Sequence, residues 1–261
     1  MSIYEYRPMM IFFIVLAAAF GAVMGSFLNC AAWRITHGES FIKGRSHCPA
    51  CGHTLGVLEL IPVFSWLFQK GRCKACGSVI PARYPLTELV FAGVTAVCLI
   101  RFDLTILCLR NYVFLCCLFV LFLTDMDDMI IPDGCHIAAI AAWILAEPFL
   151  FTGWGSTALS VGAAFLFGGG LLAVSLVMDR VLGRDSLGGG DIKLFFVVGL
   201  YLGMIGTLFT MMLACILGLV IHRIISGKEK KEFPFGPAIA VSTCIMLLFG
   251  DPVINWYSSL L

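Results

Sequence analysis

The sequence predicts an all-α polytopic membrane protein with about eight transmembrane helices and a cysteine-rich loop between the first two. Three observations lead to this prediction. The chain is 60% hydrophobic and only 13% charged, whereas a soluble domain is about 45–50% apolar. Long apolar runs alternate with short polar connections, and about 20 apolar residues suffice to span a bilayer. Four cysteines gather in the longest polar connection, at residues 34–85.

The first apolar run, at 9–29, is interpreted as a membrane span, and we predict that residues 1–33 form the first transmembrane helix. The small residues of "AAAF" (17–20) would also suit a signal-peptide cleavage site. Cleavage there would leave the cation-rich cysteine loop outside, against the preference of Lys and Arg for the cytoplasmic side. Within this run, "GAVMG" (21–25) has the spacing of small residues that lets two helices pack closely.

The loop at 34–85 contains two paired cysteine motifs, "CPAC" and "CKAC", which place the thiols of Cys48, Cys51, Cys73 and Cys76 at spacings typical of zinc ribbons. A glycine follows each pair and suits a tight turn around a metal. Disulfides are the weaker alternative in a cytoplasmic loop. Four thiolates leave no open coordination position, so we predict a structural zinc site and a zinc-ribbon-like loop. His47 and His53 are interpreted as neighbours of the metal rather than ligands.

The remaining apolar runs predict seven further spans, at 86–100, 108–124, 135–152, 157–178, 192–205, 207–225 and 236–250. The stretch 192–225 fits either one over-long span or two short ones. Two spans are favoured because one would place the lysines at 228–231 outside. With eight spans and an outside N-terminus, the cytoplasmic segments hold 14 of the 17 Lys and Arg residues. Residues 86–261 are thus predicted to form one seven-helix membrane domain.

An acidic turn at 125–133 separates two of these spans. It contains four of the chain's 16 acidic residues, at positions 125, 127, 128 and 133, and no Lys or Arg. Asp191, at the end of "SLGGGD" (186–191), is expected at the same cytoplasmic depth of the bundle. Two nearby carboxyl groups share a proton, so that one can activate water while the other protonates a scissile carbonyl. A carboxyl group of this turn paired with that of Asp191 therefore indicates aspartic-protease chemistry.

Other interpretations of these residues remain open. A helix N-cap would explain Asp133 or Asp191, and solvation would explain Asp127 and Asp128. Lys193 could interact with a carboxylate, but we favour snorkelling to the membrane interface. The glycines 188–190 could form a plain loop or let backbone approach a substrate. A proton- or ion-coupled transporter using Asp125 and Asp191 is the main alternative function, and a non-catalytic zinc-loop scaffold is a third.

The order of the motifs resembles that of the type IV prepilin peptidases over nearly the whole chain. The matching segments are "GSFLN" (25–29), the two cysteine pairs, "TDMDDMIIPD" (124–133), "GGGDIKL" (188–194) and "FPFGPAIA" (233–240). The resemblance implies that Asp125, seven residues before Pro132, and Asp191, after Gly188 and Gly190, are catalytic. Asp127 also fits the family pattern, whereas Asp128 is additional to it.

The resemblance further implies two activities of a multi-pass protein in the bacterial inner membrane, with its active site at the cytoplasmic face. One is cleavage of a short basic leader from type IV prepilins or type II pseudopilins after Gly. The other is methylation of the new N-terminus with S-adenosylmethionine, for which the sequence contains no nucleotide-binding fingerprint of the Rossmann type. We expect Asp127 and Asp128 to attract the basic leader. The expected partners are prepilin and membrane lipid, with no nucleic acid.

Overall fold

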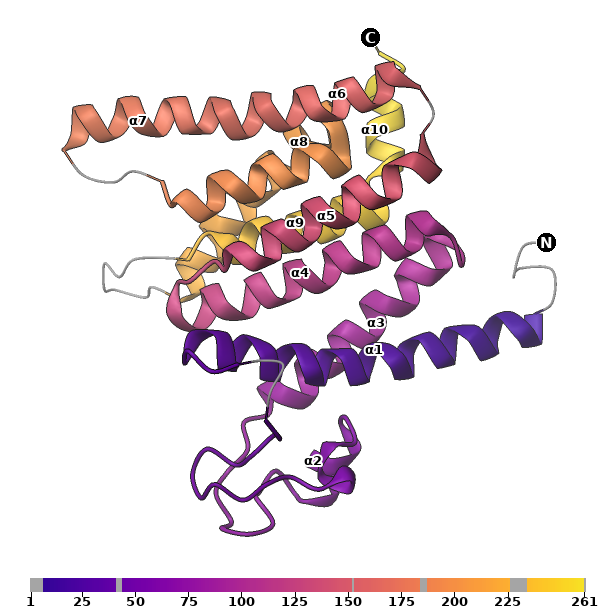
Figure 1. The fold of residues 1–261 in the computed structure, drawn as a ribbon, viewed down its shortest axis with the longest axis vertical. Helices are drawn as coiled ribbons and strands as arrows, with labels where there is room; N and C mark the ends of the chain where they lie inside the picture. The colour runs from indigo at the N-terminus through magenta and orange to yellow at the C-terminus, as the bar shows by residue number, and fades with distance from the viewer. Residues whose placement is uncertain (1–6, 41–43, 152, 184–186, 226–233, 261) are drawn as a thin grey trace. The chain divides into compact units, whose positions relative to one another are not determined.

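The computed structural model describes residues 7–40, 44–151, 153–183, 187–225 and 234–260, and its regular elements in these ranges are helices (Figure 1). The chain divides into two compact units, Met1–Cys108 and Leu109–Leu261. The predicted lysine cluster at 228–231 lies outside the described residues. The predicted division into 1–33, 34–85 and 86–261 stays a prediction, although by packing the helix that begins at Arg83 belongs to the first unit.

The first unit is built on two long helices, α1 (Arg7–Thr36) and α3 (Arg83–Phe102). Between them lie a turn of 3₁₀ helix, η2 (Val57–Leu60), and the short helix α2 (Phe64–Phe68). The rest of this connection is held by turns and by two isolated β-bridges. The unit is therefore a helix pair that carries a compact, largely irregular loop.

Helices α1 and α3 approach each other closely at the small residues that the sequence indicated. A Cβ atom on Gly21 would lie 2.5 Å from Thr95 Oγ1, and one on Gly25 would lie 3.2 Å from the Cα atom of Glu88. Near the end of α1, Asn29 donates a hydrogen bond of 2.8 Å to Thr87 Oγ1. The predicted role of "GAVMG" in helix packing is confirmed, because larger side chains would force the two backbones apart.

The second unit is a bundle whose helices are α4 (Ile106–Asp128), α5 (Asp133–Leu150), α6 (Trp154–Ala164), α7 (Gly170–Leu182), α8 (Gly189–Ile225), α9 (Gly236–Phe249) and α10 (Asp251–Ser258). A π-helical turn, η3 (Phe165–Gly169), joins α6 to α7, so the three form one run (Figure 1). Tyr201 of α8 ties the bundle together: its hydroxyl donates to Ala139 O of α5 at 2.8 Å, and its ring stacks on Phe114 of α4 at 4.0 Å.

Helix α8 is a hairpin of two arms, 189–202 and 204–225, joined at Gly203. The backbone of Gly203 is non-helical, with φ 63° and ψ −168°, a conformation that glycine adopts without a Cβ clash. Gly190 in the first arm meets Ile131, and Gly218 in the second meets Phe235, which immediately precedes α9. Gly236 also meets Ile131. Both arms of α8 therefore approach the start of α9, so the chain folds back within 192–225. Two spans in this stretch stay a prediction, because α8 as a whole is one candidate span by length and composition.

Six helices in the described ranges are long and apolar enough to cross a membrane, and the bent pair α9–α10 makes a seventh candidate span. The described helices therefore offer six or seven candidate spans, against the eight predicted. The helices turn many large apolar side chains outward, among them Phe12, Val15, Leu145 and Leu219. Such faces are expected where lipid replaces water. The molecule is an all-α polytopic membrane protein.

Candidate active site and metal centre

Asp125 lies near the end of α4, on the face of this helix that packs into the bundle. It is only 4% exposed and continues the buried stripe formed by Phe114, Leu118 and Leu121, which recurs at the three- and four-residue spacing of one helix face. The following residues, Met126, Asp127 and Asp128, are exposed. The helix therefore buries one acidic residue of the turn and leaves its two nearest acidic neighbours in contact with solvent.

Asp191 stands in the first turn of α8 and is 7% exposed. Its amide donates to Gly188 O at 3.1 Å, so the chain enters the helix through a tight turn at the glycines. Helix α8 begins at Gly189, which places Asp191 inside the helix. The N-cap interpretation of Asp191 is therefore wrong. Ile192, Leu194 and Phe195 are also buried, so Asp191 belongs to an otherwise apolar buried segment of α8.

The two aspartates come together where three helix ends meet at Ile131. A Cβ atom on Gly190 would lie 2.7 Å from Ile131 Cβ, and one on Gly236 would lie 3.3 Å from Ile131 Cδ1 and 2.6 Å from Asp125 Oδ2. The carboxylates of Asp125 and Asp191 are close enough to interact electrostatically. The tertiary fold thus places the end of α4 and the starts of α8 and α9 around one pair of carboxylates.

One oxygen of each carboxylate has no hydrogen-bond partner among the residues that the structure describes. These atoms are Asp125 Oδ2 and Asp191 Oδ1, and both are buried. Leaving a buried charged acceptor unpaired costs about 1–3 kcal/mol or more, and such atoms need an explanation in a folded protein. A shared proton and a water or substrate group between the two carboxylates would satisfy both atoms.

Glycine is required at two positions around this pair because a side chain would have no room. Gly190 packs against Ile131, and Gly236 packs against both Ile131 and Asp125. A Cβ atom on Gly188 would stand 3.1 Å from Asp191 Oδ2, whereas one on Gly189 would meet no atom within 4 Å. Gly188 and Gly190 therefore allow close packing beside the carboxylates, whereas Gly189 does not contribute to it. Gly236 was not among the predicted site residues, although it lies in "FPFGPAIA", one of the segments that carry the family resemblance.

Lys193 forms an ion pair, which corrects the snorkelling interpretation. Its Nζ atom lies 2.7 Å from Asp133 Oδ1 and so links the fifth residue of α8 to the first residue of α5. Asp133 is the first residue of α5, whose N-cap is Pro132, so the N-cap interpretation of Asp133 is also wrong. The two side chains are 56% and 65% exposed, and ion pairs this exposed contribute about 0–1 kcal/mol. The pair therefore connects the starts of α5 and α8 beside Asp191 but adds little stability.

His136 is a buried polar residue that sequence reasoning missed. It lies one turn after Asp133 on α5 and is 5% exposed, and neither ring nitrogen has a hydrogen-bond partner among the described residues. Its ring interacts electrostatically with Asp133 and Lys193. No sequence pattern distinguishes it, because a single histidine in an apolar run is most often a core residue. Its burial next to the helix starts is a product of the tertiary fold.

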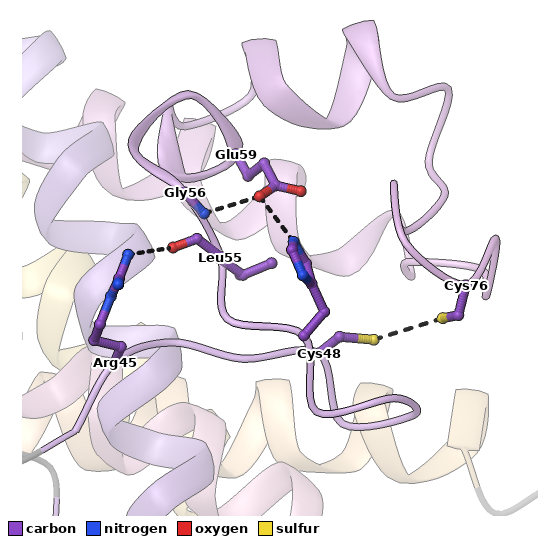
Figure 2. Close-up of polar contacts among 7 residues, drawn as sticks. Arg45, Cys48, Leu55, Gly56, Glu59 and Cys76 are labelled. Carbon is purple, nitrogen blue, oxygen red and sulfur yellow. Dashed lines mark hydrogen bonds and ion pairs between the residues drawn. The ribbon is translucent and has the colours of Figure 1, made fainter.

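The four cysteines of the loop meet in one cluster in the first unit. The Sγ atoms of Cys48, Cys51, Cys73 and Cys76 all lie within 4.8 Å of one another, and those of Cys48 and Cys76 are 4.0 Å apart (Figure 2). Tetrahedral zinc with Zn–S bonds of about 2.3 Å requires sulfur atoms about 3.8 Å apart. All four are free thiols. The donor set and its spacing fit a structural zinc ion.

The two cysteine pairs have the same backbone geometry. In the first, the Cys48 amide donates to His53 O and the Gly52 amide donates to Cys48 O, at 2.9 and 2.8 Å. In the second, the corresponding bonds of Cys73 and Gly77 are 2.8 and 2.9 Å. Gly52 and Gly77 have φ of 71° and 72°, a left-handed conformation that favours glycine. The glycine after each pair is thus needed for the turn, as the sequence indicated.

Local donors favour the thiolate form at two of the four cysteines, Cys48 and Cys76. The backbone amide of Ala50, followed by the Ser78 hydroxyl, lowers the pKa of the Cys48 thiol to about 6. Hydrogen bonds with the side chain and then the backbone of Ser78 also lower the pKa of Cys76. A lower pKa favours the thiolate, which is the form that binds metal. These two thiols are therefore biased toward ligation before any ion arrives.

Glu59 orders the segment that follows the first cysteine pair. Its Oε2 atom accepts from the Gly56 amide at 2.8 Å (Figure 2) and from His53 Nε2 at 3.2 Å. The Gly56 amide, followed by His53, holds the pKa of Glu59 below its usual range. His53 thus binds a carboxylate, and the metal-binding group in the described residues contains neither His53 nor His47.

Comparisons with known proteins match both parts of the chain. Residues 19–102 match the bacterial peptidase A24 N-terminal domain, and residues 112–222 match the type IV leader peptidase family. The prepilin leader peptidase/N-methyltransferase of Bacillus subtilis (strain 168) is 36% identical over 91% of this chain and 95% of its own length. The protein of the same name from Dichelobacter nodosus is 30% identical over 94% of each chain.

A further relative is the type 4 prepilin-like proteins leader peptide-processing enzyme of Escherichia coli O78:H11 (strain H10407 / ETEC), 29% identical over 87% of this chain and 90% of its own length. No solved structure matches this chain. The matches give no support to the transporter hypothesis.

Proposed function

The chain belongs to the type IV leader peptidase family, and we propose on this premise that it is a membrane aspartic endopeptidase that removes the leader of type IV prepilins or type II pseudopilins. Asp125 and Asp191 are its proposed catalytic residues. The observation that carries the proposal is that these two buried aspartates interact while each keeps one buried oxygen without a partner among the described residues. A pair of this kind suits a reaction that moves protons between two carboxyl groups and a substrate.

The proposed reaction is hydrolysis by general acid–base catalysis. Two close carboxyl groups hold one proton between them. The ionised carboxylate removes a proton from a water molecule, whose oxygen attacks the scissile carbonyl carbon, while the protonated partner donates to the carbonyl oxygen. The tetrahedral intermediate then collapses: the C–N bond breaks and the leaving amine takes a proton. The aspartates return to their starting state without a covalent intermediate.

The substrate is proposed to be a prepilin with a basic leader, cut after Gly at the cytoplasmic face of the bacterial inner membrane. Asp127 and Asp128 are exposed at the end of α4, next to the buried Asp125. They supply negative charge that attracts Lys and Arg in a leader. The apolar stalk of the prepilin would lie in the bilayer beside the bundle. Asp125 would then serve the chemistry while its two neighbours serve recognition.

We also propose that the protein methylates the newly exposed amine with S-adenosylmethionine. When bound, S-adenosylmethionine would supply an electrophilic methyl group for transfer to this amine. Cys48, Cys51, Cys73 and Cys76 would hold a structural zinc ion that orders the loop.

The test is cleavage of a peptide with a basic leader, a Gly–Phe junction and an apolar stalk by the purified protein. Asp125→Asn and Asp191→Asn should each abolish cleavage while the protein keeps its detergent-solubilised elution profile and its zinc. Asp251→Asn, at an exposed position of α10, is the matched control and should cleave like wild type. Cleavage that survives either dyad substitution would show that this aspartate is not catalytic, and Asp127→Asn would then be measured.

A further inference from the structure

Two cysteines that take no part in the metal centre face each other across the connection between α3 and α4. The Sγ atoms of Cys98 on α3 and Cys108 on α4 lie 3.9 Å apart. Each sulfur also lies against the backbone carbonyl of the other residue: Cys98 Sγ is 4.0 Å from Cys108 O, and Cys108 Sγ is 3.8 Å from Cys98 O. The contact is therefore reciprocal, and both residues belong to the first unit.

The connection that brings the two cysteines together is short and internally bonded. Only residues 103–105 separate the end of α3 from the start of α4. Asp103 has a φ of 52°, a region that aspartate enters more readily than most residues, and its amide donates to Leu99 O at 2.9 Å. Thr105 caps α4, since its hydroxyl accepts from the Cys108 amide at 3.2 Å. The turn thus fixes Cys108 beside the end of α3.

The distance between the two sulfur atoms is short enough for a covalent bond to form after a small movement. A disulfide has an S–S bond of about 2.05 Å, so these atoms have to approach by about 2 Å. Rotation about the Cα–Cβ bond of either cysteine, from one staggered rotamer toward the next, moves a sulfur atom by about this much. The two helices can therefore keep their places while the bond forms.

The pair lies at the opposite end of α4 from the proposed catalytic carboxylate. Cys108 is the third residue of this helix, and Asp125 follows 17 positions later, about 26 Å along the axis at 1.5 Å per residue. Helix α4 is a candidate membrane span, so its two ends face opposite sides of the bilayer. With the outside N-terminus that the Lys and Arg distribution predicts, the cysteine pair lies at the outer face. Disulfides persist in oxidising compartments outside the cytoplasm, where thiols are not kept reduced.

We propose that Cys98 and Cys108 form a disulfide at the outer face of the membrane, made by exchange with a disulfide-bearing oxidant, and that this bond staples α3 to the start of α4. Cys98 is 1% exposed and Cys108 is half-buried, so the oxidant meets Cys108 first. The proposal rests on the predicted outside N-terminus and is independent of the proposed peptidase activity.

The bond forms in two exchange steps. The Cys108 thiolate attacks one sulfur of the oxidant, whose S–S bond breaks and releases a thiolate. The Cys98 thiolate then attacks the Cys108 sulfur in this mixed disulfide and displaces the second thiolate of the oxidant. The two cysteines together lose two electrons and two protons, and the oxidant is reduced to two thiols.

The bond can be detected directly because Arg101 lies between the two cysteines. Trypsin yields peptide 84–101, whose one cysteine is Cys98, and peptide 102–110, whose one cysteine is Cys108. Spheroplasts of a bacterium that expresses the full-length protein are treated with oxidised glutathione, which does not cross the membrane, and remaining thiols are then alkylated. Mass spectrometry should find the two peptides linked, and separate after treatment with dithiothreitol. Cys215→Ala, at an exposed position of α8, is the matched control and should give the same linked pair.

The side of the membrane is tested by repeating the treatment on permeabilised spheroplasts. Peptides that link only after permeabilisation would place the pair in the cytoplasm and overturn the proposal. Peptides that stay separate and alkylated under both conditions would overturn it as well. A protein that forms the linked pair but cleaves no leader would support this proposal and contradict only the proposed function.

The stapling effect is measured by thermal unfolding of the purified protein in detergent. A disulfide restricts the unfolded chain, so the oxidised protein should unfold about 5 °C above the reduced protein. Cys98→Ala, which cannot form the bond, should unfold at the same temperature under both conditions. Equal midpoints for oxidised and reduced wild-type protein would overturn the stapling role.

Discussion

Gly236, the first residue of α9, stands so close to Asp125 that a Cβ atom built on it would lie 2.6 Å from Asp125 Oδ2. The backbone of one helix therefore sets the place of a carboxylate on another. A methyl group at this point has to displace the carboxylate, the start of α9, or Ile131 on its other side. The position of the proposed catalytic group thus depends on a residue that carries no chemistry itself.

We predict that Gly236→Ala lowers the rate of leader cleavage by about a hundredfold, because a displacement of about 1 Å at a reacting group has an effect of this size. The measurement is kcat/KM for the prepilin peptide. Gly134→Ala is the matched control, since a Cβ atom there meets no atom within 4 Å. Cleavage by Gly236→Ala at the wild-type rate would contradict the close approach.

Two adjacent glycines at the start of α8 allow the effects of two alanine substitutions on stability to be compared. Gly190→Ala should destabilise the protein by about 1–3 kcal/mol, as overpacking does, because its Cβ would lie 2.7 Å from Ile131 Cβ. Gly189→Ala should be neutral or slightly stabilising, because its Cβ meets nothing within 4 Å and Ala is the better helix former. Thermal unfolding in detergent reports both changes. Equal effects at the two positions would show that Ile131 does not restrict this turn.

The ion pair between Lys193 and Asp133 should contribute little to stability. Its side chains are more than half exposed, and such pairs contribute about 0–1 kcal/mol. A double-mutant cycle with Lys193→Met and Asp133→Asn should give a coupling energy of less than about 1 kcal/mol in the free energy of unfolding. A larger coupling would mean that the helix starts of α5 and α8 are held mainly by this pair.

The cysteine turns are expected to tolerate asparagine better than alanine after each pair. Gly52 has a φ of 71° and open space around its Cβ position, so the cost of substitution comes from the backbone alone. The left-handed conformation costs a non-glycine residue about 1–2 kcal/mol, and asparagine less. Gly52→Ala should therefore weaken zinc binding by about tenfold and Gly52→Asn by less, as measured by competition with a chelator. The reverse order would contradict the backbone explanation.

Removal of zinc should unfold the loop, because turns, two short helices and isolated bridges are its regular structure in the described ranges. A chelator should therefore make the bonds after Lys70, Arg72 and Lys74 sensitive to trypsin, and added zinc should restore protection. A Cys73→Ser variant should be cut with or without the chelator. Resistance of the metal-free protein would show that the loop folds without its ion.

Much of this molecule follows from local features of the chain. Apolar runs determined where the helices lie, and the length of 192–225 indicated the break in α8 that the structure places at Gly203. The cysteine spacing determined the two turns that carry the cluster, because each pair closes its own turn through bonds between residues at most five apart. Asp125 and Asp191 could be selected because a family motif order distinguishes them from their acidic neighbours.

The tertiary structure decided what these groups touch. Lys193 was expected at the interface, but α8 brings it to Asp133, 60 positions away. The close contacts of Gly236 and Ile131 exist only because three helix ends meet in the folded protein. The burial of His136 beside Lys193 and Asp133 likewise depends on the packing of these helices. Glu59 and Trp66 face one cavity because α1, α3 and the loop close around it. Periodicity and spacing act over a few residues, whereas these contacts join distant segments, so their geometry exists only once the helices have packed.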